Sequence, residues 1–229
     1  MKRTSIMVGG VAAAAALLAP VYATGQKKPP KAPTGTDLTI AANPNPVRFG
    51  LATTLSGKLK SGGGTAVQLQ ADEHPFEGTY VTVAQATTAT NGDYSFAGVR
   101  PKRNTNYRVE AQTTPRTKSP TLLVRVAISV RLNVSAIFDA DTSPRRGDRV
   151  TFSGTAKPAH DDNLVQIQRR QADGSYKTLA QTTLQDDGTS GSKYTRRLTI
   201  STSGTYRVKV PGDADHASGY KKASINVED

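Results

Sequence analysis

One sequence pattern occurs twice in this chain of 229 residues, and it constrains the fold more than any other feature. Residues 54–57 (Thr-Leu-Ser-Gly) and 67–70 (Val-Gln-Leu-Gln) correspond to residues 151–154 (Thr-Phe-Ser-Gly) and 165–168 (Val-Gln-Ile-Gln). The correspondence continues from 81–88 to 177–183 and from 106–109 to 205–208. Two copies of one structural unit, joined end to end, are therefore predicted.

The residue types and turn signals predict that both copies are all-β. The strand regions are rich in Thr, Val, Ile and Tyr, and turn residues such as Asn91-Gly92 separate them at short intervals. Val165 and Ile167 share one face by the two-residue period and are predicted to be buried. We predict two tandem antiparallel β-sandwich domains, over residues 37–129 and 130–229, and expect their short join to restrict the angle between them. In the strand 194–200, Arg196 falls on the inward face, which predicts either a β-bulge or a position at the rim.

The N-terminus reads as an export signal. Lys2 and Arg3 precede an apolar run, and residues 21–23 (Val-Tyr-Ala) provide a cleavage pattern, so residues 1–23 are predicted to be a signal peptide. Retention of this segment as a membrane anchor is the alternative, although the run is short for a bilayer span. Residues 24–36, rich in Pro and Lys, are predicted to be a disordered tether. We expect a secreted or cell-envelope protein with no stable membrane span in the mature chain.

Charge and cysteine content limit the partners and the chemistry. The formal net charge is +12 and there is no cysteine, which excludes disulfides and thiolate sites. A basic surface favours weak attraction to an anionic envelope polymer. Nucleic acid is not an expected partner, because aromatic platforms, zinc-finger spacing and a basic recognition helix are missing. We expect a monomer whose protein partner the sequence does not identify.

The repeated strands resemble a known fold family. Residues 150–154 and 203–208 are similar to strands B and F of bacterial immunoglobulin-like (Ig-like) sandwich repeats of exported proteins, and Tyr107 and Tyr206 stand where that fold places its tyrosine corner. The Cys pair and the strand C Trp of antibody domains are missing. Residues 90–96 with 107–109 are also similar to carboxypeptidase regulatory-like modules. The resemblance implies an Ig-like fold and brings no catalytic residues.

Catalytic motifs are not found. The patterns Gly-x-Ser-x-Gly and His-Glu-x-x-His do not occur, and His74, His160 and His216 stand singly in expected loops. We therefore predict that the protein is not an enzyme and has no cofactor, apart from a possible calcium ion.

Calcium is suggested by acidic residues in three loops of the second copy. In an Ig-like sandwich the B–C, C′–E and F–G loops meet at one end, which would gather two histidines and six carboxylates, namely those of Asp161, Asp162, Asp186, Asp187, Asp213 and Asp215. Three interpretations stay open. The carboxylates serve loop turns, they pair with Arg100, Lys102 and Arg103 of the first copy, or they hold a calcium ion through clustered oxygens.

Taken together, these features predict a secreted or envelope protein that works by binding, adhesion or spacing. The alternative is an accessory carbohydrate- or peptide-binding module that works with a separate secreted enzyme. Aromatic residues form only 6% of the chain and Trp is absent, so a platform for stacking sugars is poorly supplied.

Overall fold

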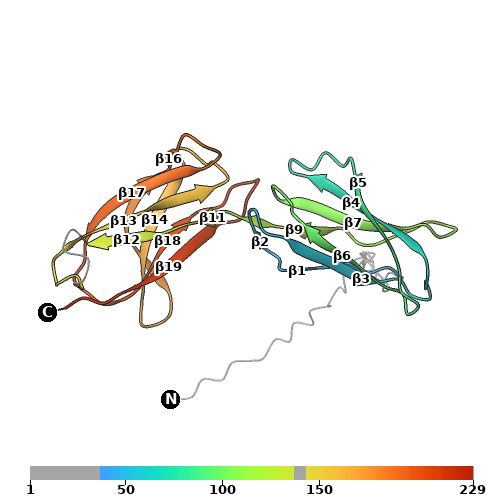
Figure 1. The fold of residues 1–229 in the computed structure, drawn as a ribbon, viewed down its shortest axis with the longest axis horizontal. Helices are drawn as coiled ribbons and strands as arrows, with labels where there is room; N and C mark the ends of the chain where they lie inside the picture. Colours follow the sequence, from blue (N-terminus) through green and yellow to red (C-terminus); the bar gives the residue numbers. More distant parts are fainter. Residues whose placement is uncertain (1–36, 137–142, 229) are drawn as a thin grey trace, which may run out of the picture. The chain divides into compact units, whose positions relative to one another are not determined.

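The computed structural model describes residues 37–136 and 143–228. These residues form β-strands and connecting loops, with no helix among them (Figure 1). The fold is therefore all-β, as predicted. The predicted signal peptide and tether, residues 1–36, lie outside the described residues. No helix within the described ranges is long and apolar enough to cross a membrane.

The first half of the described chain forms two facing sheets. Strands β1 (Ala41–Asn43), β3 (Thr53–Lys58) and β6 (Asp93–Val99) make one sheet in the order β1-β3-β6. The other contains β5 (Val81–Thr87), β4 (Ala66–Glu73) and β7 (Thr105–Ala111), with β8 (Thr117–Lys118) and β9 (Leu122–Val124) both paired to β7. A short parallel pair joins β2 (Val47–Arg48) to β10 (Val126–Ala127).

The second half repeats this plan. One sheet has the order β11-β13-β17-β16, with β12 also on β13, and the other has the order β15-β14-β18-β19. This division, A-B-E-D against C′-C-F-G, is the Ig-like strand order. The strands are β11 (Ser129–Val130), β12 (Asn133–Ala136), β13 (Arg149–Lys157), β14 (Leu164–Arg170), β15 (Tyr176–Thr183), β16 (Gln185–Asp186), β17 (Ser192–Thr199), β18 (Gly204–Val210) and β19 (Gly219–Ile225).

Each half has its own hydrophobic core. The first core includes Val67 and Leu69 of β4, and the second includes Val165 and Ile167 of β14, all fully buried. The residues between them in sequence face the other side of the sheet, as the two-residue period requires. The predicted inward positions of strand C are thus confirmed.

A glycine, a tyrosine and a backbone carbonyl form the same arrangement in both halves. Tyr194 of β17 donates a hydrogen bond from Oη to the carbonyl oxygen of Arg131 at 2.7 Å, and both groups lie over Gly154 of β13. A Cβ at Gly154 would lie 2.7 Å from Tyr194 Oη and closer still to that carbonyl oxygen. In the first half Tyr94 and Gly57 repeat the arrangement. Burial raises the pKa of both phenols, so each remains a donor. The repeated Ser-Gly pair therefore reflects a close approach of backbone and ring.

An arginine on the outer sheet face is the second repeated feature. Arg207 of β18 donates from Nε to Gln168 Oε1 at 2.7 Å, and its guanidinium lies 3.6 Å from the centre of the Tyr176 ring, a cation–π geometry. In both halves the pairing of strand C with its neighbour shifts register just before this glutamine, between Ile167 and Gln168 in the second half and between Leu69 and Gln70 in the first. In the first half the equivalent residues are Arg108, Gln70 and Tyr80, with distances of 2.7 and 3.7 Å.

Tyr206 and Arg196 are the subjects of two further sequence predictions. Tyr206 donates from Oη to the carbonyl oxygen of Thr202 at 2.6 Å, which is the predicted tyrosine corner. Pairing of β13 with β17 is continuous, with Arg196 opposite Phe152, so the β-bulge is not formed. Arg196 is exposed. Because directly opposite residues share a face, Arg196 lies on the face that carries the buried Phe152, although Arg196 itself is exposed.

Glu110 of β7 is a buried carboxylate with two cationic partners. Its oxygens lie 2.7 Å from Arg116 Nη1 and 3.3 Å from Lys118 Nζ. Burial by itself would raise the pKa of Glu110, but the hydrogen bonds and positive charges of the two partners outweigh it and lower the pKa below its usual value. The side chain is therefore ionised at neutral pH.

Candidate functional site

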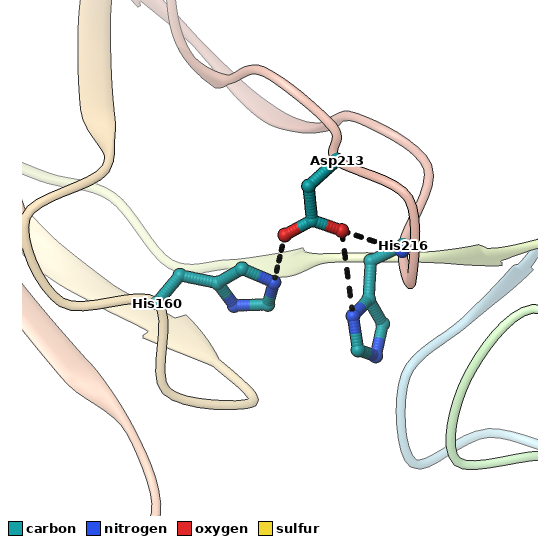
Figure 2. A group of neighbouring side chains, drawn as sticks. All are labelled: His160, Asp213 and His216. Carbon is teal, nitrogen blue, oxygen red and sulfur yellow. Dashed lines mark hydrogen bonds and ion pairs between the residues drawn. The ribbon is translucent and has the colours of Figure 1, made fainter. Parts of the chain in front are cut away.

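Two loops of the second half bring a histidine pair and an aspartate together. The β13–β14 loop carries His160, and the β18–β19 loop carries Asp213 and His216 (Figure 2). These are the B–C and F–G loops, so their predicted convergence at one end of the sandwich is correct. The metal-ligating atoms of the three side chains all lie within 4.8 Å of one another. We call His160, Asp213 and His216 the histidine–aspartate cluster.

Backbone hydrogen bonds fix the position of each side chain in the cluster. The N–H of His160 donates to Ser192 Oγ at 2.8 Å. Asp213 Oδ1 accepts from the N–H groups of Asp215 and His216 at 2.9 and 2.8 Å, so the carboxylate closes its own loop turn. The cluster is thus held by local loop geometry that places the carboxylate between two imidazoles.

The carboxylate of Asp213 faces a ring nitrogen of each histidine. Oδ2 lies 3.2 Å from His160 Nε2, and Oδ1 lies 3.9 Å from His216 Nδ1 (Figure 2). The imidazoles meet edge to face, with centroids 4.9 Å apart and an interplanar angle of 79°. Their side chains are only 6% and 7% exposed, whereas that of Asp213 is 38% exposed. The cluster is consequently reached from solvent on the aspartate side.

The outer ring nitrogens of both histidines contact backbone carbonyl oxygens. His160 Nδ1 lies 2.8 Å from the oxygen of Pro158, and His216 Nε2 lies 2.9 Å from the oxygen of Lys102. Burial is the largest influence on the pKa of His216 and lowers it, with a further lowering from His160; the Lys102 carbonyl, Asp213 and Asp215 act in the opposite direction. His216 is therefore neutral at pH 7, where its Nδ1 is buried and has no hydrogen-bond partner.

The six predicted calcium ligands do not gather into one donor set within the described residues. Asp213 alone belongs to a group that could hold a metal ion. Asp186 and Asp187 accept hydrogen bonds from the residue two positions later, Asp186 from Gly188 N and Asp187 from Thr189 N and Oγ. Asp161 accepts from Ser192 Oγ of β17. Asp162 has φ of +66°, a turn conformation. The calcium hypothesis stays a prediction, and the turn interpretation describes most of these residues.

Charge pairing between the two copies occurs at Asp215. Its Oδ1 lies 2.9 Å from His74 Nδ1, and its Oδ2 lies 3.7 Å from Arg103 Nη1. Of the three basic residues predicted to meet the acidic loops, Arg103 does so through its side chain and Lys102 through its backbone oxygen. Arg100 instead donates to the carbonyl oxygen of Gly50 at 2.9 Å.

Sequence reasoning placed His160 and His216 at this end but treated both as inert loop residues. What it missed is that both rings are buried. The available signal was the topology itself, because the B–C and F–G loops bring the two imidazoles together with Asp213. Calcium takes oxygen ligands, so the calcium hypothesis did not cover a mixed set of nitrogen and oxygen ligands.

Comparisons with known proteins add little to these observations. No family model matches the chain, and no curated protein matches it. Among solved structures, a tetra-tandem repeat from the extending region of a large adhesion protein is 19% identical, with 84% of this chain and 50% of that one covered and a TM-score of 0.35. Red sea bream transglutaminase is 11% identical, with 85% and 32% covered and a TM-score of 0.42. A titin A168–A169 structure is 16% identical, with 85% and 98% covered and a TM-score of 0.31.

The chain spans half of the adhesion repeat structure and about a third of the transglutaminase. All three TM-scores lie below 0.5, so the Ig-like assignment rests on the strand order of the sheets themselves. The resemblance to carboxypeptidase regulatory-like modules stays a prediction.

Proposed function

We propose that this protein is a non-catalytic spacer or binding module of the cell envelope, in which two Ig-like domains are held at a fixed angle. The observation that carries the proposal is the hydrogen-bonded junction around Asn104. The envelope location comes from the predicted signal peptide and is part of the proposal.

Asn104 of the first half binds the β18–β19 loop of the second through backbone and side chain. Its N–H donates to the oxygen of Asp215 at 2.7 Å, and its Nδ2 donates to the oxygen of Ala214 at 2.9 Å. Its Oδ1 accepts from the N–H of Val126 at 2.9 Å. One nearly buried side chain therefore connects the loop before β7, the joining strand and the second sandwich.

The polypeptide joining the two cores is short. Val126 belongs to the first core and Ile128 to the second, with only Ala127 between them. Ala217 binds on both sides of this join, because its N–H donates to Val126 at 2.8 Å and its oxygen accepts from Ile128 at 3.0 Å. Such a join favours a spacer over a flexible string of two domains.

The proposal is tested by measuring the distance distribution between the two halves. The natural chain lacks cysteine, so Gln85→Cys and Lys177→Cys, both on exposed strand positions, allow site-specific spin labels and double electron–electron resonance. We expect one narrow distribution that broadens when Asn104 is replaced by Ala. The matched control is Asn45→Ala, because Asn45 bridges Leu123 and Arg125 through the same two side-chain bonds within the first half.

A narrow distribution in the parent and in Asn45→Ala, broadened only by Asn104→Ala, supports a fixed junction. A broad distribution in the parent would contradict the spacer function. A narrow one unaffected by Asn104→Ala would show that Asn104 does not hold the junction.

A further inference from the structure

The hydrogen bonds of the two histidines decide which ring nitrogens carry protons. A carbonyl oxygen accepts only, so His160 Nδ1, facing Pro158, and His216 Nε2, facing Lys102, are N–H donors. In a neutral imidazole the other nitrogen is then an unprotonated lone pair. His160 Nε2 and His216 Nδ1 are those nitrogens, and both face the carboxylate of Asp213.

When both imidazoles are neutral, three electron-pair donors therefore converge with no proton between them. Two imidazole lone pairs and a carboxylate oxygen repel one another unless a cation lies among them. His216 Nδ1 shows the consequence directly, since it is buried, without a hydrogen-bond partner, on a side chain only 7% exposed. A buried polar atom without a partner carries a free-energy penalty that a bound ion would remove.

We propose that the histidine–aspartate cluster is a binding site for a divalent transition-metal ion, Zn²⁺ in the first place, with His160 Nε2, His216 Nδ1 and the Asp213 carboxylate as ligands. Imidazole nitrogen and carboxylate oxygen are ordinary zinc ligands at about 2.0–2.2 Å. Ligand atoms around a tetrahedral zinc ion lie roughly 3.3 Å apart by this geometry. Asp213 Oδ2 lies 3.2 Å from His160 Nε2 and Oδ1 lies 3.9 Å from His216 Nδ1. All three ligand atoms lie within 4.8 Å of one another, so the side chains must move inward to bind the ion.

The surroundings match those of a zinc site beyond the ligands. Metal-bound histidines almost always donate their second N–H to a carbonyl or carboxylate, which fixes the ring and the tautomer. Pro158 and Lys102 provide those carbonyl oxygens. The partly exposed Asp213 leaves an entry path and room for a water molecule as the fourth ligand.

Calcium fits these residues less well than zinc. Calcium requires six to eight oxygen ligands, and two of the three donors here are nitrogens. The Nδ1 atom of His216 is buried and has no hydrogen-bond partner, so it is available to a metal ion.

A bound ion would connect the β13–β14 and β18–β19 loops, and His216 would extend that connection to Lys102. All three ligands lie in two loops of the second half, and the Lys102 carbonyl of the first half contacts His216 without being a ligand. The metal site is therefore a separate proposal from the spacer function.

The experiment uses the untagged chain, which has three histidines and no cysteine, so competing soft ligands are few. Zn²⁺ binding is measured by titration calorimetry, and thermal unfolding is followed with Zn²⁺, with Ca²⁺ and with a chelator. Co²⁺ is a spectroscopic substitute whose visible absorption reports coordination by nitrogen and oxygen ligands. The ligand variants are His160→Gln and His216→Gln. The matched control is His74→Gln, which removes the remaining histidine, outside the cluster.

We expect one Zn²⁺ per chain and a Zn²⁺-dependent rise in Tm that Ca²⁺ does not reproduce. Each ligand variant should weaken binding on the order of 100-fold or more, since losing even an outer-shell partner weakens it 10–100-fold. His74→Gln should bind as the parent does. A rise with Ca²⁺ equal to that with Zn²⁺, or unchanged Zn²⁺ affinity in both ligand variants, would overturn the site.

A measurement on the parent protein keeps the test valid if a ligand variant does not fold. In histidine-selective NMR spectra, Zn²⁺ should shift the ring signals of His160 and His216 and leave those of His74 in place. Shifts confined to His74, or none at all, would likewise overturn the proposal. Either result is distinguishable from failure of the spacer function, which the spin-label distances report separately.

Discussion

Replacing Gly154 by Ala should destabilise the second half strongly, although Gly→Ala substitutions at unstrained positions usually stabilise a protein. At a position whose backbone any residue can adopt, Gly→Ala stabilises by about 0.4–1 kcal/mol, because it reduces the entropy of the unfolded chain. Gly154 does not have a positive φ, so its backbone alone permits alanine. The space above it does not, because the new Cβ would lie 2.7 Å from Tyr194 Oη and closer still to the Arg131 carbonyl oxygen.

The magnitude follows from what must move. Relieving the contact pushes the backbone at Arg131 away from β13, which strains the packing by about 1–3 kcal/mol. The same movement weakens the hydrogen bonds from Tyr194 Oη to Arg131 at 2.7 Å and from Arg131 N–H to Thr155 at 2.8 Å, each contributing about 1 kcal/mol. We therefore expect a loss of about 2–5 kcal/mol, a large part of the roughly 5–15 kcal/mol that stabilises a typical domain.

The assay is urea denaturation followed by tyrosine fluorescence and far-ultraviolet circular dichroism, with Tm from a thermal scan. Gly57→Ala is the parallel test in the first half, where a Cβ would meet Tyr94 and the Thr39 carbonyl in the same way. Ser153→Ala, one residue away on the same strand, is the control and should change stability little. If Gly154→Ala were as stable as the parent or more stable, the close packing of strand, ring and carbonyl would be refuted as the reason for the repeated glycine.

Two other predictions concern single side chains. Glu110→Gln should lower stability at pH 7: the depressed folded pKa of Glu110 gives stability that is present above the unfolded value of about 4.3 and is lost as pH falls through the folded pKa. The difference from the parent in urea midpoint should therefore shrink below pH 4, and a difference that does not vary with pH would argue against ion pairing. Tyr206→Phe removes the donor to Thr202 and should cost about 1 kcal/mol, seen as a lower urea midpoint at unchanged slope; an unchanged midpoint would show that the tyrosine corner does not contribute to stability.

The strands could be predicted from the sequence because local residue patterns determine them. Val165 and Ile167 alternate with polar neighbours, and both lie in the second core as the two-residue period predicts. The repeated Ser-Gly pair was visible as a pattern, but its cause was not, since Tyr194 and the Arg131 carbonyl are distant in sequence. Arg196 could not be decided, because the alternation of a strand does not say whether a long side chain reaches solvent from the core face.

The candidate site was only half predictable for a related reason. Fold topology was enough to bring His160 and Asp213 to one end of the sandwich. The nitrogen that carries the proton in each imidazole depends on the carbonyl oxygens of Pro158 and Lys102. Lys102 lies 114 residues from His216 in the chain. No spacing rule reports a contact of that kind, so the imidazoles looked like ordinary loop residues.

The join at Ala127 has a consequence for mechanical load. Val126 and Ile128 are anchored in different cores, so the chain has no slack residue at which one half can be pulled away before the other responds. A force that extracts Val126 acts at once on Ile128 and on the two hydrogen bonds of Ala217. Inserting a flexible Gly-Ser segment after Ala127 would supply the missing slack and separate one rupture event in a force-extension trace into two.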